Sequence, residues 1–152
     1  METSCPFCEL LQCNDLIISS SEHFVVIYNQ APILPGHVMV IPKEHIERVL
    51  DLNQEAQVEM MTLSLDTIKV LLQVFKAKAF NWVIQEGTEA GQTIAHLHMH
   101  LIPRKEQDLP DPGDWYPRLK ESQTNLLIDS HLRKKYSRDD LKQITAYIKK
   151  QM

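Results

Sequence analysis

Three histidines at every second position mark the segment whose side chains are most able to do chemistry, HLHMH at residues 96–100. Successive side chains of a β-strand point to opposite faces of a sheet. A strand over residues 94–102 therefore places the three imidazoles on one face, and the intervening leucine and methionine on the face that can enter a core. Such a row of imidazoles can bind a metal ion or handle an anion such as a phosphate.

Phosphate chemistry suits this row because a neutral imidazole is a good nucleophile toward phosphorus. His98 has a histidine on each side, and a protonated neighbour lowers its pKa, so it is the best-placed nucleophile. His37 begins another apolar segment and reaches the same oxygens if the two strands are neighbours. Gln85 and Gln92 flank a glycine-containing loop and can donate hydrogen bonds to a phosphate or leaving oxygen. Taken alone, each of these last three residues is more often a solvated surface residue.

Metal binding is the alternative, and two hypotheses about the location of the metal site stay open. Cys5 and Cys8 have the spacing of zinc ligands, but no second cysteine pair follows at the distance of a zinc finger. From the residues alone, a metal site and two plain thiols are equally favoured. A separate hypothesis makes HLHMH itself the ligand set of a metal-dependent hydrolase. It predicts that His98→Asn removes the metal, whereas the nucleophile hypothesis predicts that metal stays and turnover stops.

Composition narrows the class of protein. The 152 residues are enough for one domain with its own core, and 16 basic against 20 acidic residues give a net charge of −4. That balance argues against a nucleic-acid partner. The longest apolar run has five residues, which fits neither a transmembrane helix nor a secretory signal, so we expect a cytoplasmic protein with reduced thiols and no membrane partner.

The elements that must position the histidines follow from local patterns. β-branched and aromatic runs predict strands over 23–29, 37–42, 80–85 and 94–102. Residues 43–51 are expected to form a short helix, and residues 108–118 are expected to be irregular because they hold three prolines. This order predicts an α+β fold, an antiparallel β-sheet with a long helix packed on one face and a final helix in the C-terminal region.

Two helices carry recognisable start signals. Asn53 is a candidate N-cap for the long helix. Its apolar residues recur at steps of three and four, which predicts a core-facing stripe of Val58, Met61, Leu65, Ile68, Leu72, Phe75 and Ala79. Ser137 and Asp140 resemble a capping box that opens the final helix, with Leu141, Ile144 and Ile148 on one face.

Two segments, PILPGHVMVIP at 32–42 and EAGQTIAHLHMHLIPRK at 89–105, resemble the signature segments of the histidine triad (HIT) nucleotide-binding family. The resemblance spans about residues 5–105. It is closest to the bacterial zinc-containing HIT proteins and to the fragile-histidine-triad hydrolases of dinucleoside polyphosphates. It implies a HIT domain over 1–107, a C-terminal extension over 108–152 packed on the same domain or on a dimer partner, and a homodimer.

The resemblance also implies roles for single residues. His98 would attack the α-phosphate, His100 and His37 would contact phosphate oxygens, and His96 would support the row. Asn29 matches a ribose-binding position. Gln85, Gln92 and Thr93 belong to a loop, QEGTEAGQT, that follows the fragile-histidine-triad branch, with Gln92 close to the chemistry. A third histidine at position 100 favours hydrolysis over uridylyl transfer.

A zinc site is implied in the same way. Bacterial members bind zinc through positions that match Cys5, Cys8, His45 and His96. Four protein ligands leave no position for water, so the zinc would be structural and would hold the N-terminus beside the active site. A divalent metal could accompany the substrate polyphosphate.

The expected function is hydrolysis of dinucleoside polyphosphates, of the diadenosine tri- or tetraphosphate type, at an α-phosphate through a nucleotidyl-histidine. One alternative is a nucleoside phosphoramidate hydrolase, which differs only in the leaving group. Another is a nucleotide-binding regulatory module with little turnover. For the segment PGDWYPR, at 112–118, one hypothesis is that it packs over a nucleotide cleft and tunes substrate choice, and the other is that its tryptophan simply covers the subunit's own surface.

Overall fold

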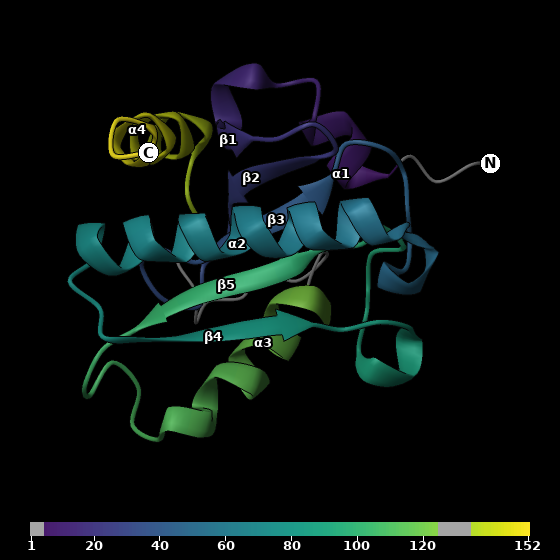
Figure 1. Cartoon of the computed structure of the whole chain (residues 1–152). Coiled ribbons are helices and arrows are strands. Elements are labelled where there is room, and N and C mark those ends of the chain that lie inside the picture. The colour runs from purple at the N-terminus through teal and green to yellow at the C-terminus, as the bar shows by residue number, and fades with distance from the viewer. Residues whose placement is uncertain (1–4, 125–134) are drawn as a thin grey trace.

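A computed structural model describes residues 5–124 and 135–152, which fold around a five-stranded antiparallel sheet (Figure 1). The strands lie in the order β1-β2-β3-β5-β4. They are β1 (Ile17–Ser20), β2 (Phe24–Tyr28), β3 (Val38–Pro42), β4 (Ala79–Ile84) and β5 (Met99–Arg104). The helices are α1 (Pro6–Leu10), α2 (Gln54–Val74), α3 (Trp115–Thr124) and α4 (Arg138–Lys149). The predicted α+β fold with a long helix and a final helix is confirmed.

The histidine segment enters the sheet later than its alternation predicts. Strand β5 begins at Met99 instead of residue 94, because the backbone before it makes other hydrogen bonds. The N–H of Leu97 donates to the carbonyl of Ile46 at 2.6 Å, outside the ladder of β3 and β5. The alternation of faces still holds, since Leu97, Met99 and Leu101 all enter the core beneath α2.

Helix α2 begins as predicted, because the Asn53 side chain accepts a hydrogen bond from the N–H of Ala56 at 2.8 Å. The predicted core stripe is wrong for about half of its members. Val58, Met61 and Leu65 are exposed at 60%, 48% and 42%, and Ala79 is an exposed residue of β4. The buried side carries Ala56, Met60, Ser64, Thr67, Ile68 and Leu71. Small residues there let the helix approach the sheet closely, and they turn the more apolar stripe outward.

Two other predictions of local structure need correction. Residues 43–51 form no α-helix, only a 3-10 turn over Val49–Asp51. Residues 108–118 are not wholly irregular, since α3 begins at Trp115. Pro117 lies in the first turn of α3, where backbone N–H groups have no partner within the helix and proline costs little.

The helices divide between the two faces of the sheet. Leu141 and Ile148 of α4 share one core cluster with α2, while Phe7 of α1 packs on the opposite face against a cluster that includes Ile27 and Met39. The capping box of α4 is confirmed, with Ser137 and Asp140 bonded reciprocally. On the α3 side, Trp115 packs against a small cluster of Ile33, Ile102 and Leu119. The histidine face of β5 lies on the α1 side, where the Phe7 ring contacts the rings of His96 and His98.

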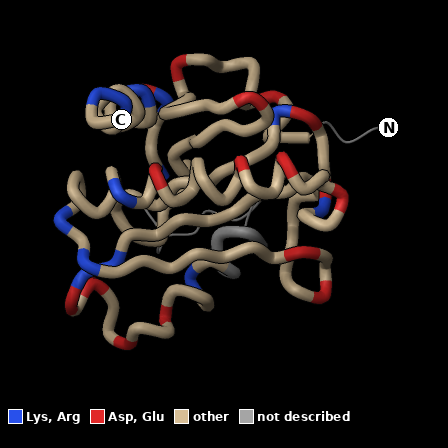
Figure 2. The backbone as a smooth tube through the Cα atoms, viewed as in Figure 1, with Lys and Arg blue, Asp and Glu red and all other residues tan. Residues whose placement is uncertain are grey.

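The charged residues are not evenly distributed over the fold. Figure 2 shows most basic positions on the left of the view, around α4 and the end of α2, whereas acidic positions extend over the other parts. Helices in the two described ranges are all too short or too polar to cross a membrane.

Candidate active site and metal site

A cavity of about 390 Å³ opens beside α1, and two of the three row histidines line it. Its walls are Pro6, Phe7, Leu10, Tyr28, Asn29, Gln30, Ala31, Met39, Thr93, Ile94, His98, His100 and Lys135. About half of these are apolar, and the rest are polar groups that converge on the same space, a mixture found in small-molecule sites. No carboxylate is among these lining residues, and Lys135 is the one with a permanent charge. The cavity therefore favours an anionic ligand.

His98 presents an unprotonated nitrogen on the wall of this cavity. Its Nδ1 lies 2.8 Å from the carbonyl oxygen of His96. A carbonyl only accepts, so the proton is on Nδ1 and the lone pair is on Nε2. Burial lowers the pKa of His98, against the opposing effect of that hydrogen bond. The ring is therefore neutral near pH 7, as a nucleophile must be.

His37 and His100 form a second hydrogen-bonded unit with a defined tautomer. The backbone N–H of Ile33 donates to Nδ1 of His37 at 3.1 Å, which leaves the His37 proton on Nε2. That Nε2 lies 2.9 Å from Nδ1 of His100 and donates to it. The neutral His100 ring then carries its proton on Nε2, where it can act as a donor. His37 is fully buried behind His100 and does not line the cavity.

Gly36 explains how His37 can occupy this buried position. Its φ of +88° is a conformation that favours glycine. A Cβ at this position would come within 2.6 Å of Pro103 and 2.7 Å of Phe75. The Pro-Gly turn thus lets β3 begin against both neighbours, with His37 directed toward Ile33 and His100.

The remaining predicted nucleotide-binding residues divide into two groups. Asn29 and Thr93 line the cavity. Gln85 and Gln92 do not, because their amides hold the loop between them. Gln92 accepts from the N–H of Gly87 at 2.8 Å and donates to a carbonyl, and Gln85 is buried and donates to Ala90 at 2.9 Å.

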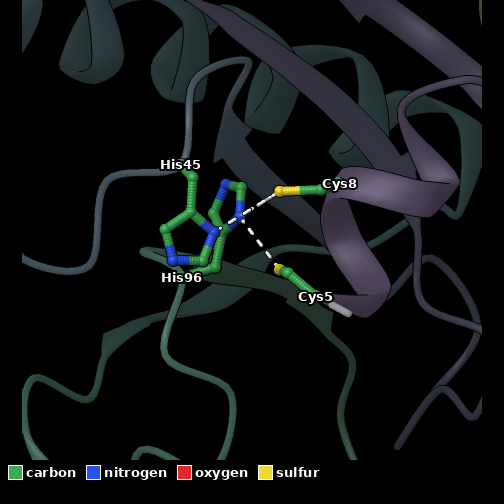
Figure 3. A group of neighbouring side chains, drawn as sticks. All are labelled: Cys5, Cys8, His45 and His96. Atoms are coloured by element: carbon green, nitrogen blue, oxygen red, sulfur yellow. Dashed lines mark hydrogen bonds between the residues drawn. The ribbon is translucent and has the colours of Figure 1, made fainter. Parts of the chain in front are cut away.

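Cys5, Cys8, His45 and His96 converge on one point, and we call them the Cys/His cluster (Figure 3). Their four ligand atoms all lie within 4.8 Å of one another. Individual separations are 3.3 Å for Cys5 Sγ to His96 Nδ1, and 3.4 Å for Cys8 Sγ to His45 Nδ1. Ligands on a tetrahedral zinc ion at ordinary bond lengths lie about 3.4–3.8 Å apart. These residues could therefore hold such an ion once the widest separation closes by up to about 1 Å.

The protonation of His96 suits a metal ligand. Its Nε2 donates to the carbonyl of Pro42 at 3.0 Å, so the lone pair is on Nδ1, which faces the two sulfurs. Burial also lowers the pKa of His96, and the neutral ring is the form that binds metals. A carbonyl that orients the ligand in this way is a common second partner of metal-bound histidine.

Helix α1 connects the Cys/His cluster to the cavity. Cys5 is the N-cap of α1 and Cys8 lies within it. Phe7, between them, places its ring centroid 5.6 Å from that of His96 and 5.2 Å from that of His98. Any ion that fixes the two cysteines would thereby fix the aromatic wall of the cavity.

The structure argues against the histidine row as a single metal-ligand set. Among the described residues, the Cys/His cluster is the one group with the donor geometry of a metal site, and it contains only His96 of the three. Nδ1 of His98 instead donates to the carbonyl of His96. Nδ1 of His100 accepts from His37.

Comparison with known proteins identifies the family. The HIT domain matches residues 11–107. The chain belongs to the histidine triad family. The match covers β1 to β5 and leaves the first ten residues, α3 and α4 outside.

Among curated HIT relatives, the chain is 41% identical over 98 residues to the asymmetrical bis(5'-nucleosyl)-tetraphosphatase of Schizosaccharomyces pombe. That match covers 64% of this chain and 54% of the relative, so the chain spans about half of that protein. It is 31% identical over 112 residues to a bis(5'-adenosyl)-triphosphatase of Dictyostelium discoideum, covering 74% of each. An AP-4-A phosphorylase of Mycobacterium tuberculosis is 33% identical over 103 residues, covering 65% of this chain and 53% of the relative. These relatives act on dinucleoside polyphosphates.

A solved HIT structure is similar in fold to most of this chain. The zinc-bound histidine triad protein of Mycobacterium smegmatis has a TM-score of 0.63 at 27% identity. The alignment covers 81% of this chain and 95% of that chain.

No local sequence pattern predicted Lys135 as part of this HIT site. It comes from the segment before α4, far from the histidines along the chain. A hydrogen bond of 2.9 Å from the N–H of Tyr136 to the carbonyl of Gln30, and a contact between the rings of Tyr28 and Tyr136 at 5.3 Å, hold this segment at the cavity. Trp115 and Tyr116, which were considered for this place, do not line the cavity.

Proposed function

We propose that this protein hydrolyses dinucleoside polyphosphates, of the diadenosine tri- or tetraphosphate type, at an α-phosphate. The observation that carries the proposal is the neutral, buried His98, whose unprotonated Nε2 belongs to a ring on the wall of a carboxylate-free cavity. The similarity to dinucleoside polyphosphate enzymes supports the choice of substrate class.

The reaction proceeds in two steps. In the first, Nε2 of His98 forms a bond to the α-phosphorus while the anhydride P–O bond breaks and the rest of the substrate leaves as a nucleoside polyphosphate anion. In the second, water attacks the same phosphorus, the P–N bond breaks, and a nucleoside monophosphate is released with the imidazole restored. Phosphate in place of water would give the corresponding phosphorolysis.

The neighbouring residues stabilise charge and orient the ligand. His100 donates from Nε2 to a phosphate oxygen, and His37 acts as a positioning residue that fixes the tautomer of His100. Asn29 and Thr93 contact the nucleotide from the cavity wall. Gln85 and Gln92 position the glycine loop, and Gln92 can reach the leaving group only if that loop rearranges.

Zinc is the metal we propose for the Cys/His cluster. Two sulfurs and two imidazole nitrogens are ligands that zinc prefers, and four of them leave no open position, so the ion would act on structure and not on the reaction. The zinc-bound relative supports this choice. A divalent ion in the cavity would have to arrive with the polyphosphate, since the lining residues include no carboxylate.

We further propose a HIT domain over 1–107 with an extension over 108–152, and a homodimer. Val58, Met61 and Leu65 form an exposed apolar stripe on α2. Strand β4 is at the edge of the sheet and exposes Phe80 at 40%. A second copy placed against α2 and β4 would cover both features.

Two alternative functions make different predictions. A nucleoside phosphoramidate hydrolase uses the same histidines with an amine as the leaving group. A regulatory nucleotide-binding module binds nucleotides with little turnover.

The test measures turnover of a panel of dinucleoside polyphosphates and phosphoramidates. The reactions are quenched without acid, and the intact mass of the protein is measured to detect a nucleotidyl adduct. We expect turnover of the polyphosphates and an adduct that is stable to base and lost in acid. Turnover of phosphoramidates alone would support the first alternative, and tight binding without any product would support the second.

A further inference from the structure

The backbone N–H of Ile33 begins the series of hydrogen bonds that fixes the tautomer of His100. It donates to Nδ1 of His37 at 3.1 Å, and Nε2 of His37 donates to Nδ1 of His100 at 2.9 Å. A shift of Ile33 away from His37 by about 1 Å would take the first of these bonds out of hydrogen-bonding range. The position of Ile33 therefore decides where the protons of both imidazoles lie.

Ile33 belongs to the loop over residues 29–37, which connects β2 and β3. Its side chain is buried and packs in one cluster with Ile102 and Leu119. Ile102 lies two residues after His100 in β5 and so faces the same side of the sheet. Leu119 belongs to α3, outside the matched HIT residues 11–107. The support of Ile33 thus comes partly from the HIT domain and partly from the C-terminal extension.

Arg104, on the same side of β5, attaches the start of the extension to the sheet. Its Nε and Nη2 each donate to an oxygen of Asp108 at 2.9 Å. Its Nη1 donates to the side chain of Asn81 at 2.6 Å and to the carbonyl of Pro112 at 3.0 Å. The guanidinium is largely buried, and a bidentate ion pair of this kind has a fixed geometry. Helix α3, which begins three residues after Pro112, therefore starts from a defined position.

Helix α3 presents one apolar side to this cluster. Trp115 and Leu119 are one turn apart and both pack there, and Leu119 is fully buried. Protein interiors are close-packed, so truncation of Leu119 leaves a cavity that its neighbours can partly fill by moving. Ile102 is held in the ladder between β4 and β5, whereas Ile33 lies in a loop. Ile33 is therefore the neighbour that we expect to move.

We propose that Leu119 of α3 is a positioning residue whose packing keeps the N–H of Ile33 on His37. The proton of His100 then stays on Nε2. This inference rests on the proposed function, in which that Nε2 donates to a phosphate oxygen. It gives α3 a role in the reaction although Leu119 does not line the histidine cavity.

The experiment compares wild type with Leu119→Ala and with Ile148→Ala, a matched control. Ile148 is also fully buried, but it comes from α4 and packs in the cluster beneath α2. Both variants should lower the melting temperature by a similar amount, about 10 °C. Nitrogen-15 NMR of the free proteins should show mixed tautomers of His37 and His100 in Leu119→Ala and the wild-type tautomers in Ile148→Ala. We expect kcat to fall about threefold to tenfold in Leu119→Ala alone, with little change in KM.

Two further variants separate position from stability. Leu119→Met keeps the volume and should restore the wild-type tautomers and kcat. Leu119→Val leaves a smaller cavity and should show the same changes to a lesser degree, which keeps the test decisive if Leu119→Ala does not fold. Wild-type tautomers in a folded Leu119→Ala or Leu119→Val would overturn the inference. Mixed tautomers in Ile148→Ala would also overturn it, because the change would then follow from any loss of stability.

Failure of the proposed function would look different from failure of this inference. Wild type would then hydrolyse no dinucleoside polyphosphate, but the tautomers of the free protein would still respond to the truncation of Leu119. Normal hydrolysis in wild type with unchanged tautomers in the variants would reject only the role of α3.

Discussion

His96 and His98 stand two residues apart in one row, yet their unprotonated nitrogens face different chemistry. His96 donates from Nε2 to the carbonyl of Pro42 and turns Nδ1 to two sulfurs. His98 donates from Nδ1 to the carbonyl of His96 and keeps Nε2 for the cavity. The position of the nearest backbone carbonyl thus decides whether each imidazole serves the Cys/His cluster or the catalytic histidines, by which we mean His98 and His100.

The largest effect should come from removing the nucleophile. His98→Asn is expected to lower kcat by about 10³-fold or more, because the proposed covalent adduct forms on this imidazole. Metal content, measured by elemental analysis, should equal that of wild type. Loss of metal along with turnover would mean that the Cys/His cluster and the catalytic histidines form one site.

The reverse experiment removes a sulfur. Cys8→Ala should abolish metal binding and lower the melting temperature by about 10 °C or more, since a structural ion contributes several kcal/mol to folding. Turnover should also fall, because Phe7 would be displaced from His98. The loss should be smaller than in His98→Asn. Cys13→Ser is the control, because Cys13 lies outside the Cys/His cluster and should leave metal and stability unchanged.

The sequence predicts the features of this site that neighbouring residues determine, and it does not predict those that depend on contacts between distant segments. The alternation of residues 96–101 predicts which side chains enter the core, because period two is a local property of the backbone. Nothing local predicts that His37 is buried behind His100, or that Lys135 reaches the cavity, since both depend on how distant segments meet. The buried side of α2 differs from the predicted stripe for a similar reason. Small residues determine which side of the helix approaches the sheet, whereas the prediction used only the spacing of apolar residues.

A subtler change separates positioning from catalysis. His37→Asn should lower kcat by roughly 10-fold to 100-fold, because His100 would no longer have its proton fixed on Nε2. KM and metal content should change little. Nitrogen-15 NMR of the imidazoles should show His100 protonated on Nε2 in wild type and in a mixture of tautomers in the variant. A single Nε2-protonated form in both proteins would contradict the assigned role of His37.

Lys135 tests whether the segment before α4 belongs with the catalytic histidines. Lys135→Ala is expected to weaken binding of AMP about threefold to tenfold by removing the fixed positive charge of the cavity, and the loss should shrink at high salt. Lys149→Ala, at the exposed end of the same C-terminal region, is the matched control. Equal affinities in the two variants would remove Lys135 from the site.

The smallest expected effect lies outside both groups of residues. Glu59 on α2 accepts hydrogen bonds from the backbone N–H and Nδ1 of His23, at 2.8 and 2.6 Å, and from the hydroxyl of Ser21. Partial burial acts to raise the pKa of Glu59, but these bonds prevail and lower it to about 2, while the bond to Glu59 raises the pKa of His23. This group of residues ties α2 to the turn between β1 and β2.

The two shifts give Glu59→Gln a defined pH profile. A lowered carboxyl pKa contributes stability above about pH 4.5 that is lost as pH falls toward 2, and a raised histidine pKa contributes stability below about pH 6.5 that is lost at higher pH. The difference in unfolding free energy between wild type and the variant should therefore be largest between these values and smaller at pH 4 and pH 8, and solvent screening keeps it small throughout because the pair lies at the surface. Urea titrations at three pH values measure it. Because Glu59 touches neither group of site residues, metal content and kcat should stay at wild-type levels, so losses seen in the other variants cannot be ascribed to weaker folding alone.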